Sequence, residues 1–222
     1  MTDVDQLLLN FNQKKNFEND NFYVSKSNFL AYETLNKWPR WEKNILNIYG
    51  EKYSGKTHLA NIFKKKSKTK YILENELNDE IFKDLKLYEC IILDNFENII
   101  SERILYTLFN FIDQSNKYLL IISEKPINKF KFDLRDLSSR AKNCLFAEIE
   151  MPDDELIFAI IIKNFSDRQI TMEKKLIEFI IKRIDRSYSK IYDFIYKLDE
   201  LSLKKKKPIT LKIVKEILKV KN

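Results

Sequence analysis

The sequence predicts an α/β domain built on a parallel sheet covered by helices, followed by a small all-helical domain. Short continuous apolar runs such as ECIIL and KYLLIIS alternate with helical patterns up to residue 149. This alternation is typical of parallel strands whose two faces are both buried. After residue 150 the sequence shows only the 3.6-residue periodicity of amphipathic helices.

The α/β part begins with a predicted helix at residues 25–38, which ends there because Pro39 cannot continue a helix. Strands and helices then alternate. The predicted strands are 44–49, 70–73, 89–93, 117–123 and 144–149, and the helices between them are 56–66, 76–87, 101–115 and 134–142.

Four further helices are predicted at 153–165, 172–184, 187–203 and 211–220. The predicted domains are therefore an N-terminal arm at 1–21, the α/β domain at 22–150 and the helical domain at 151–222. Apart from a short apolar cluster at 7–11, the arm is polar, which is typical of a flexible terminus.

Composition excludes several classes of protein. With 44% hydrophobic and 13% aromatic residues, the chain can bury a core, unlike disordered or collagen-like chains. It has no apolar run long enough for a membrane span, and its first residues lack the basic start of a signal peptide. One histidine and two cysteines are too few for the usual structural zinc sites. We expect a soluble cytoplasmic protein with two buried free thiols.

The net charge of +7, from 40 Lys and Arg against 33 Asp and Glu, invites a nucleic-acid interpretation. However, Asn, Ile, Phe and Tyr are also abundant, and AT-rich codons favour these residues together with Lys. The basic runs 64–66 and 204–207 fall near predicted helix ends, where cations complement the helix dipole. Charge alone therefore does not predict DNA binding.

Both glycines of the chain belong to one motif, residues 50–57 (GEKYSGKT). It fits G-x-x-x-x-G-K-[ST] between a predicted strand and a predicted helix, which is the context that this motif requires. The glycines let the loop approach phosphate oxygens, and backbone N–H groups with the helix N-terminus attract the anion. Lys56 would reach the β- and γ-phosphates and Thr57 would place its hydroxyl on Mg²⁺. The sequence predicts binding of ADP or ATP by Gly50, Ser54, Gly55, Lys56, Thr57 and His58.

A second acidic site follows the apolar strand 89–93. Asp94 supplies the carboxylate that a phosphate-loop ATPase needs in its magnesium shell. Asn95 stands where an acid usually follows, and an amide can orient water but is no base at neutral pH. Glu97 lies two residues further on, but the alternation of side-chain directions along an extended chain does not guarantee that it faces the γ-phosphate. We expect tight nucleotide binding with weak or no ATP hydrolysis. The hydrolysis rate should be about 10²-fold or more below that of a site with an acid at this position.

Three other polar residues are candidates for contacts with phosphate. Glu124 follows the strand 117–123, where a polar side chain can sense the γ-phosphate. Arg140, in the segment LRDLSSR, is either an arginine finger that reaches a neighbour's nucleotide or half of a surface salt bridge. Arg186 opens a helix of the helical domain and either contacts a phosphate or is solvated there.

The loop, the acid strand, LRDLSSR and the helical appendix together resemble the AAA+ ATPases, and more narrowly their DnaA-related branch. Ser27-Asn28 is similar to the segment that helps form the adenine pocket in that branch, which adds Asn28 to the nucleotide-binding residues. We expect the chain to end at the helical lid, without the helix-turn-helix domain that DnaA has. With its Asp-Asn strand end, it looks like the Hda-type regulatory inactivators of DnaA.

The resemblance implies roles for particular residues. Arg140 matches the finger position, which acts in trans on a neighbouring subunit. Glu124 stands where the family usually has an aspartate after the sensor strand. The family's lid arginine falls at or near Ser189, with Arg186 one turn earlier, so that either Arg186 substitutes or the contact is lost.

The N-terminal segment 6–11 (QLLLNF) is similar to the Gln-Leu-x-Leu-x-Phe peptides that dock on the sliding clamp of the bacterial replicase. Gln6 would be the polar anchor, and Leu7, Leu9 and Phe11 would fill apolar pockets. Because ordering an arm costs entropy, we expect an affinity of about micromolar. Alternatively, this segment folds back on its own domain.

These features predict a regulator of chromosomal replication initiation. Tethered to the sliding clamp, the β subunit of DNA polymerase III, it would stimulate ATP hydrolysis by the initiator DnaA through Arg140. DNA would be contacted indirectly through the clamp, and the protein could form homo-oligomers. A loader-type AAA+ ATPase for a helicase or recombinase and a non-enzymatic adaptor that holds ADP are the alternatives.

Overall fold

The computed structural model of the chain describes residues 22–167, 170, 172–205 and 209–218. The chain divides into two compact units, one comprising residues 28–150 and the other the residues up to Ser27 together with those from Met151 onward. Segment 22–27 thus groups with the helical unit, although we predicted it as the start of the α/β domain. Within the helical unit, the Ser27 N–H donates to Asp153 Oδ2 at 3.3 Å.

The α/β unit is built on a five-stranded sheet with the order β2-β3-β4-β1-β5. Every neighbouring pair of strands is parallel, which confirms the predicted fold class. The strands are β1 (Ile45–Gly50), β2 (Thr69–Leu73), β3 (Cys90–Phe96), β4 (Tyr118–Ser123) and β5 (Leu145–Ile149). Since all strands run the same way, the loops that follow β1, β3 and β4 meet at one edge of the sheet.

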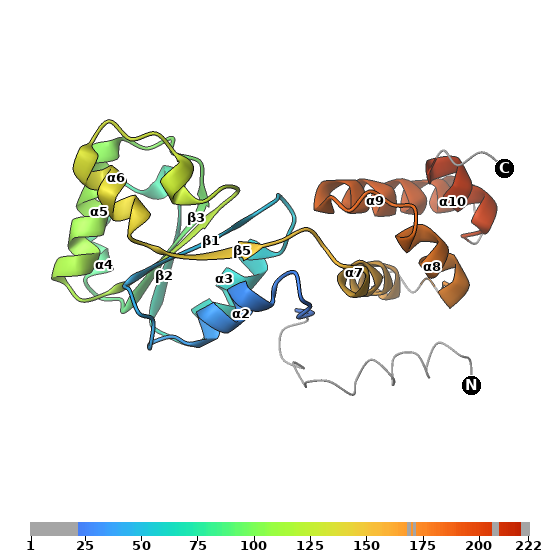
Figure 1. Cartoon of the computed structure of the whole chain (residues 1–222), viewed down its shortest axis with the longest axis horizontal. Helices are drawn as coiled ribbons and strands as arrows, with labels where there is room; N and C mark the ends of the chain where they lie inside the picture. The colour runs from blue at the N-terminus through green and yellow to red at the C-terminus, as the bar shows by residue number, and fades with distance from the viewer. Residues whose placement is uncertain (1–21, 168–169, 171, 206–208, 219–222) are drawn as a thin grey trace. The chain divides into compact units, whose positions relative to one another are not determined.

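Helices cover both faces of this sheet, as Figure 1 shows. On one side lie α2 (Phe29–Asn36) and α3 (Lys56–Lys64), and on the other α4 (Phe82–Leu85), α5 (Glu102–Gln114) and α6 (Arg135–Lys142). The core between the sheet and α5 and α6 contains alternate strand residues, among them Leu93, Leu119 and Ile121. Their neighbours Ile92, Leu120 and Ile122 are equally buried and point to the opposite face. Burial on both faces explains the continuous apolar runs.

Two predicted helices of the α/β unit are much shorter in the structure, and the helix predicted at 172–184 covers only Lys174–Ile181. The helix expected at 76–87 is reduced to the 3₁₀ turn η1 (Glu74–Glu76) and the one-turn α4. Between them, Asn78 Oδ1 accepts hydrogen bonds from the N–H groups of Glu80 and Ile81 at 3.0 and 3.2 Å, and such side-chain turns compete with the helix. The helix expected at 25–38 begins only at Phe29. In the segment that precedes it, the hydroxyls of Ser25 and Ser27 hydrogen-bond to each other.

The helical unit contains α7 (Asp154–Ser166), α8 (Lys174–Ile181), α9 (Tyr188–Lys205) and α10 (Leu211–Leu218). Asp153 caps α7, because its Oδ1 accepts the Leu156 N–H at 2.8 Å. An isoleucine-rich core joins the helices of this unit. Across the described ranges, no helix is long and apolar enough to cross a membrane.

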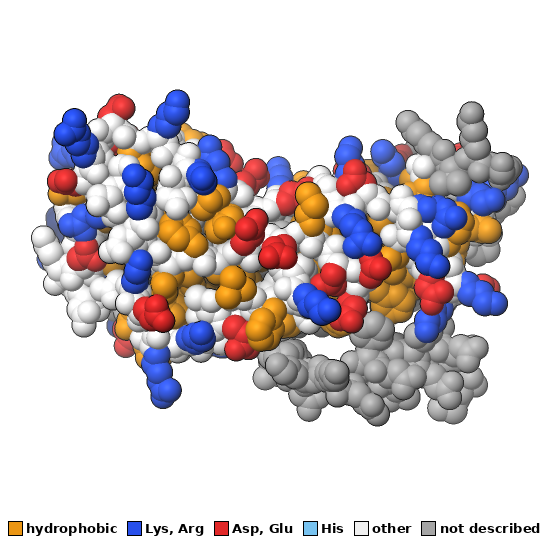
Figure 2. All heavy atoms as spheres, in the orientation of Figure 1, with side chains coloured by type: hydrophobic (Ala, Val, Ile, Leu, Met, Phe, Trp, Pro, Cys, Tyr) orange, Lys and Arg blue, Asp and Glu red, His pale blue; other side chains and the backbone are white. Residues whose placement is uncertain are grey.

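Charged side chains of both signs are interspersed on the face of each unit drawn in Figure 2. On this face, the basic side chains therefore do not form a patch free of acidic groups. This distribution agrees with the interpretation that most lysines are solvated surface residues.

Candidate phosphate-binding site

The loop between β1 and α3 has the backbone conformations that its two glycines allow. Gly50 ends β1 with φ +155°, and a Cβ at this position would lie 2.6 Å from the Ile149 carbonyl oxygen of β5. Gly55 is the N-cap of α3, with φ 93°. Tyr53 between them is also left-handed, with φ 68°, a conformation that non-glycine residues adopt mainly in constrained functional loops. The loop thus turns tightly and opens a helix whose first N–H groups can receive an anion.

Lys56 is buried against this loop. Its Nζ donates to the carbonyl oxygens of Gly50 and Glu51, each at 2.7 Å, and lies 3.4 Å from Ser54 Oγ. Burial lowers the pKa of the Lys56 amine, whereas the carboxylates of Glu124, Asp94 and Glu51 act to raise it. The loop therefore holds a buried cation whose backbone partners phosphate oxygens can replace.

Asp94 collects hydrogen bonds from two other elements at the end of β3, where it is 1% exposed. Its Oδ2 accepts from the Thr57 hydroxyl of α3 at 2.9 Å and from the Tyr71 hydroxyl of β2. Burial and Asp94 both raise the pKa of Tyr71, which stays a neutral donor. The structure thus brings together Thr57 and Asp94, as the motif requires, and adds Tyr71.

A β-bulge changes the directions of the side chains around Asp94. The pairing of β3 with β4 shifts between Leu93 and Phe96, and Asn95 is left-handed with φ 55°. Asp94 and Phe96 are both buried while Asn95 between them is exposed. Asp94 and Asn95 of β3 thus stand opposite Ile122 of β4 alone, which is the two-against-one pairing of a bulge. The Asn95 N–H donates to Asp94 Oδ1 at 2.7 Å, which orients the carboxylate.

Glu74, 3% exposed, anchors the loop that follows β3. Its Oε2 accepts the Glu97 N–H at 2.6 Å, and its Oε1 accepts those of Ile99 and Ile100 at 2.7 and 3.2 Å. Charge-assisted bonds of this kind are among the stronger hydrogen bonds in proteins. Sequence reasoning missed both residues, because Tyr71 lies in a short strand with an ordinary pattern and Glu74 begins the 3₁₀ turn that follows it.

Asn47 fixes the end of β4. It is fully buried in β1, where its Nδ2 donates to Ser123 Oγ at 2.9 Å and its Oδ1 accepts the Ile127 N–H at 2.8 Å. Glu124, which follows Ser123, is exposed and acts on the pKa of Lys56 from this position. Asn47 could have been identified from the sequence, because an amide inside an apolar strand is buried and needs hydrogen-bond partners.

The two arginines singled out from the sequence both make ion pairs within their own units. Arg140 Nη1 contacts Asp113 Oδ2 of α5, and its guanidinium carbon lies 5.7 Å from the centre of the Tyr106 ring. Arg186 Nη2 lies 2.6 Å from Asp154 Oδ1 in the helical unit.

The remaining predicted residues differ in their surroundings. Asn28 is 1% exposed in the α/β unit, and His58 is half-buried on α3. The clamp-peptide residues Gln6, Leu7, Leu9 and Phe11 lie outside the described residues.

The donor set of Thr57 and Asp94 suits Mg²⁺. This ion takes oxygen ligands and usually combines one or two protein groups with water and substrate phosphates. The hydroxyl and the carboxylate meet at 2.9 Å beside the loop. In the part of the chain that the structure describes, no group of three or more His, Cys, Asp and Glu is placed to hold a metal ion. Any magnesium here would depend on a phosphate ligand.

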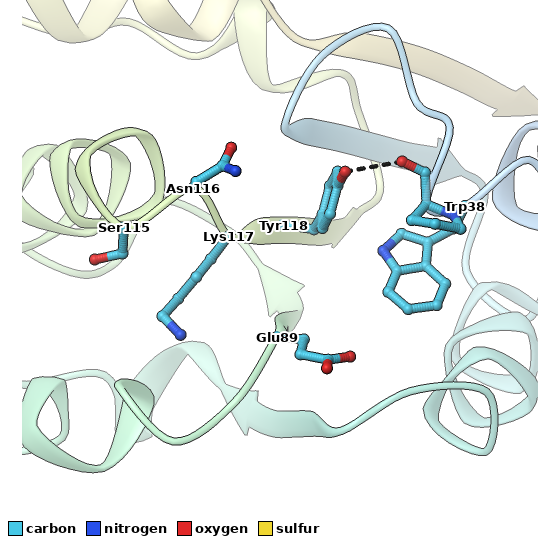
Figure 3. A pocket seen from close by; sticks show the side chains of 7 residues that line it. Trp38, Glu89, Ser115, Asn116, Lys117 and Tyr118 are labelled. Atoms are coloured by element: carbon cyan, nitrogen blue, oxygen red, sulfur yellow. Dashed lines mark hydrogen bonds between the residues drawn. The ribbon is translucent and has the colours of Figure 1, made fainter.

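A separate cavity of about 350 Å³ opens at the other edge of the sheet (Figure 3). Its lining includes Glu89 and Lys117, which directly precede β3 and β4. The Tyr118 hydroxyl donates to the Pro39 carbonyl oxygen at 2.8 Å across one side of it. This cavity lies at the amino ends of these strands and is therefore distinct from the phosphate loop.

Comparisons with known proteins agree with this geometry. Residues 153–218 match the family model described as Hda, lid domain. An uncharacterised protein of Haemophilus influenzae is 27% identical over 96% of this chain and 98% of its own length. The chromosomal replication initiator protein DnaA of Flavobacterium psychrophilum is 28% identical over 93% of this chain and 49% of its own length. The chain thus spans about half the length of this DnaA relative.

Two solved structures share the fold. Domain III of DnaA from Thermotoga maritima superposes with a TM-score of 0.70 at 22% identity, covering 90% of this chain and 94% of that one. AMPPCP-bound DnaA from Aquifex aeolicus gives a TM-score of 0.66 at 22% identity, covering 82% of this chain and 64% of that one.

Proposed function

Because this chain is a homologue of DnaA with the AAA+ fold and a lid that matches the Hda model, we propose that it is a nucleotide-dependent regulator of replication initiation. It binds ADP or ATP at residues 50–57 and, tethered to the sliding clamp, stimulates ATP hydrolysis by DnaA. The observation that carries this proposal is the grouping of Lys56, Thr57 and Asp94 around one glycine-dependent loop.

Nucleotide binding is supported by the chemistry of the loop. Phosphate oxygens would take over the Lys56 ammonium from the two loop carbonyls, and the first N–H groups of α3 would add further donors. A DnaA homologue of the same fold binds AMPPCP, which supports adenine as the base. Asn28 would belong to the adenine pocket, Ser54 and Glu124 would lie near the phosphates, and His58 follows Thr57 on α3.

Magnesium would be held by Thr57 and Asp94. When bound, it supplies positive charge that neutralises the phosphates. Tyr71 and the Asn95 N–H keep the Asp94 carboxylate oriented by hydrogen bonds to its two oxygens. Glu74 keeps the following loop in place.

Weak hydrolysis by the chain itself follows from Asn95 and Glu97. Asn95 cannot accept a proton from water at neutral pH. Glu97 follows the bulge, and its backbone is tied to Glu74 at 2.6 Å. Binding of the nucleotide is therefore the main use of this site, and hydrolysis takes place on the partner's ATP.

Arg140 is the residue that would act on that ATP. A guanidinium that enters a neighbour's active site stabilises the charge of the transition state and is worth about 10³-fold or more in rate. Arg140 lies on α6 and its side chain is 34% exposed, so a partner can reach it. The lid arginine Arg186 would approach phosphate only by leaving Asp154, its partner at 2.6 Å.

Tethering to the clamp rests on the sequence of residues 6–11. The experiment combines DNA-loaded clamp, DnaA charged with labelled ATP and this protein, and follows conversion of the DnaA-bound label to ADP. We expect stimulation that requires the clamp and is lost with Gln6→Ala combined with Leu7→Ala. Stimulation that survives this double substitution would remove the tether from the proposal.

A non-enzymatic adaptor that holds ADP is the second candidate. The ion pair of Arg140 with Asp113 favours it, because a paired guanidinium is not free to enter a partner's site. In that case the Arg140→Ala variant would leave ATP loss from DnaA unchanged.

A further inference from the structure

Arg140 has an acidic partner and an aromatic partner on the neighbouring helix α5. Its Nη1 contacts Asp113 Oδ2, and the guanidinium carbon lies 5.7 Å from the centre of the Tyr106 ring. Tyr106 and Asp113 are seven residues apart, which places them two turns apart on one face of the helix. The side chains of Arg140 and Asp113 are 34% and 48% exposed, so the pair forms at the surface.

The backbone of α6 is fixed independently of this pair. Glu102 Oε1 and Oε2 accept the N–H groups of Asp133 and Leu134, both at 2.8 Å, at the start of α6. Leu137 and Ala141 of the same helix are fully buried in the core. A change in the position of the guanidinium therefore requires only rotation of the Arg140 side chain.

We propose that Asp113 is a positioning residue that stores the Arg140 guanidinium on α5 and releases it when the triphosphate of an adjoining ATP-bound subunit competes for it. This inference rests on the proposed function, which makes Arg140 the finger. A triphosphate carries several negative charges against the single charge of Asp113. Exposed ion pairs are weak, so the competition favours the triphosphate.

The charge of Asp113 determines the expected effect. Asp113→Asn keeps the shape but removes the charge, so the released position becomes more populated. An exposed pair shifts such an equilibrium by about two- to fivefold. Apparent affinity scales with the fraction of the competent state, so the half-maximal concentration in the DnaA assay should fall by this factor. The maximal rate should stay unchanged, because the arginine in the complex is the same.

The first measurement needs no partner. Phenylglyoxal modifies accessible arginines, and mass spectrometry of the peptide that contains Arg140 gives the rate of its modification. Arg103, whose side chain is 83% exposed, serves as the internal standard. We expect the Arg140 rate in Asp113→Asn to be about two to five times that of the wild-type protein. Asp113→Glu should restore the slow rate. Asp84→Asn, an exposed acid on α4, should leave it unchanged.

The second measurement repeats the DnaA assay with the same variants. Equal Arg140 modification rates in wild type and Asp113→Asn would overturn the inference. Faster modification without a lower half-maximal concentration would overturn the release step. If the wild type and Arg140→Ala act alike on DnaA, the proposed function is wrong, and the modification rates still decide whether Asp113 stores Arg140.

Discussion

The Thr57 hydroxyl donates a hydrogen bond of 2.9 Å to Asp94 Oδ2, which joins the first turn of α3 to the end of β3. The two residues lie 37 positions apart in the sequence and meet because parallel strands end at one edge of the sheet. Both are oxygen ligands of the kind that Mg²⁺ prefers. The contact therefore supports the interpretation of residues 50–57 as a nucleotide site.

Lys56→Ala should weaken binding of ADP by about 100-fold or more, because the variant loses charge-assisted hydrogen bonds to two phosphates. Fluorescence anisotropy with a labelled ADP measures the Kd directly. Lys83→Ala, which removes an exposed lysine on α4, is the matched control and should bind as the wild type does. ADP binding by Lys56→Ala at wild-type strength would contradict the assignment of the loop.

Asp94→Asn should abolish the gain in ATP affinity that Mg²⁺ provides, while binding in EDTA should stay close to that of the wild type. The reason is that the amide keeps an acceptor for the Thr57 hydroxyl but loses the charge that holds the cation. Titration with Mg²⁺ at fixed ATP measures this effect, with Asp84→Asn as the control. A wild-type response to Mg²⁺ in Asp94→Asn would show that the metal binds elsewhere.

Glu74→Gln should lower the free energy of unfolding by about 2 kcal/mol, because charge-assisted hydrogen bonds to backbone N–H groups become weaker and an amide donor faces other donors. Unfolding in urea measures this change. Glu80→Gln, an exposed acid nearby, should stay within about 0.5 kcal/mol of the wild type. A loss no larger than that of Glu80→Gln would mean that Glu74 does not anchor the loop.

Cys144 makes stability depend on pH in alkaline solution. Burial raises the pKa of its thiol from 9.0 to about 12. Above pH 9.0 the unfolded chain loses this proton while the folded chain keeps it, so the free energy of unfolding falls as the pH rises, by up to about 1.4 kcal/mol per unit.

Urea unfolding at about pH 8 and about pH 10 measures this slope. Cys144→Ala should remove part of it, and Cys90, whose thiol pKa burial also raises, should account for another part. Because the substitution also changes packing, the slopes are compared rather than the absolute stabilities. Identical slopes in wild type and Cys144→Ala would contradict the raised pKa of this thiol.

Much of the α/β unit could be predicted from the sequence, because doubly buried parallel strands appear as continuous apolar runs. The phosphate loop was equally visible, since Gly50 must avoid the Ile149 carbonyl and Gly55 must adopt φ 93°. The length of helix α4 was overestimated, because periodicity does not reveal that the Asn78 side chain forms a turn by accepting the Glu80 N–H.

The contacts around Asp94 and Arg140 could not be predicted in the same way. Tyr71 reaches Asp94 through the pairing of β2 with β3, and periodicity does not specify which strands are neighbours. Asp113 meets Arg140 only because α5 and α6 pack on the same face. Such contacts depend on tertiary geometry, whereas the loop is local in sequence.

We propose above all that this chain promotes hydrolysis of ATP held by another protein. The most direct measurement charges DnaA with labelled ATP and this protein with unlabelled ADP, adds DNA-loaded clamp, and follows the nucleotide on DnaA by chromatography. We predict conversion of the DnaA-bound label to ADP with the wild-type protein. With Arg140→Ala the rate should fall by about 10³-fold, or to that of DnaA alone, and Arg103→Ala should behave as the wild type. Equal conversion with and without Arg140 would contradict the account.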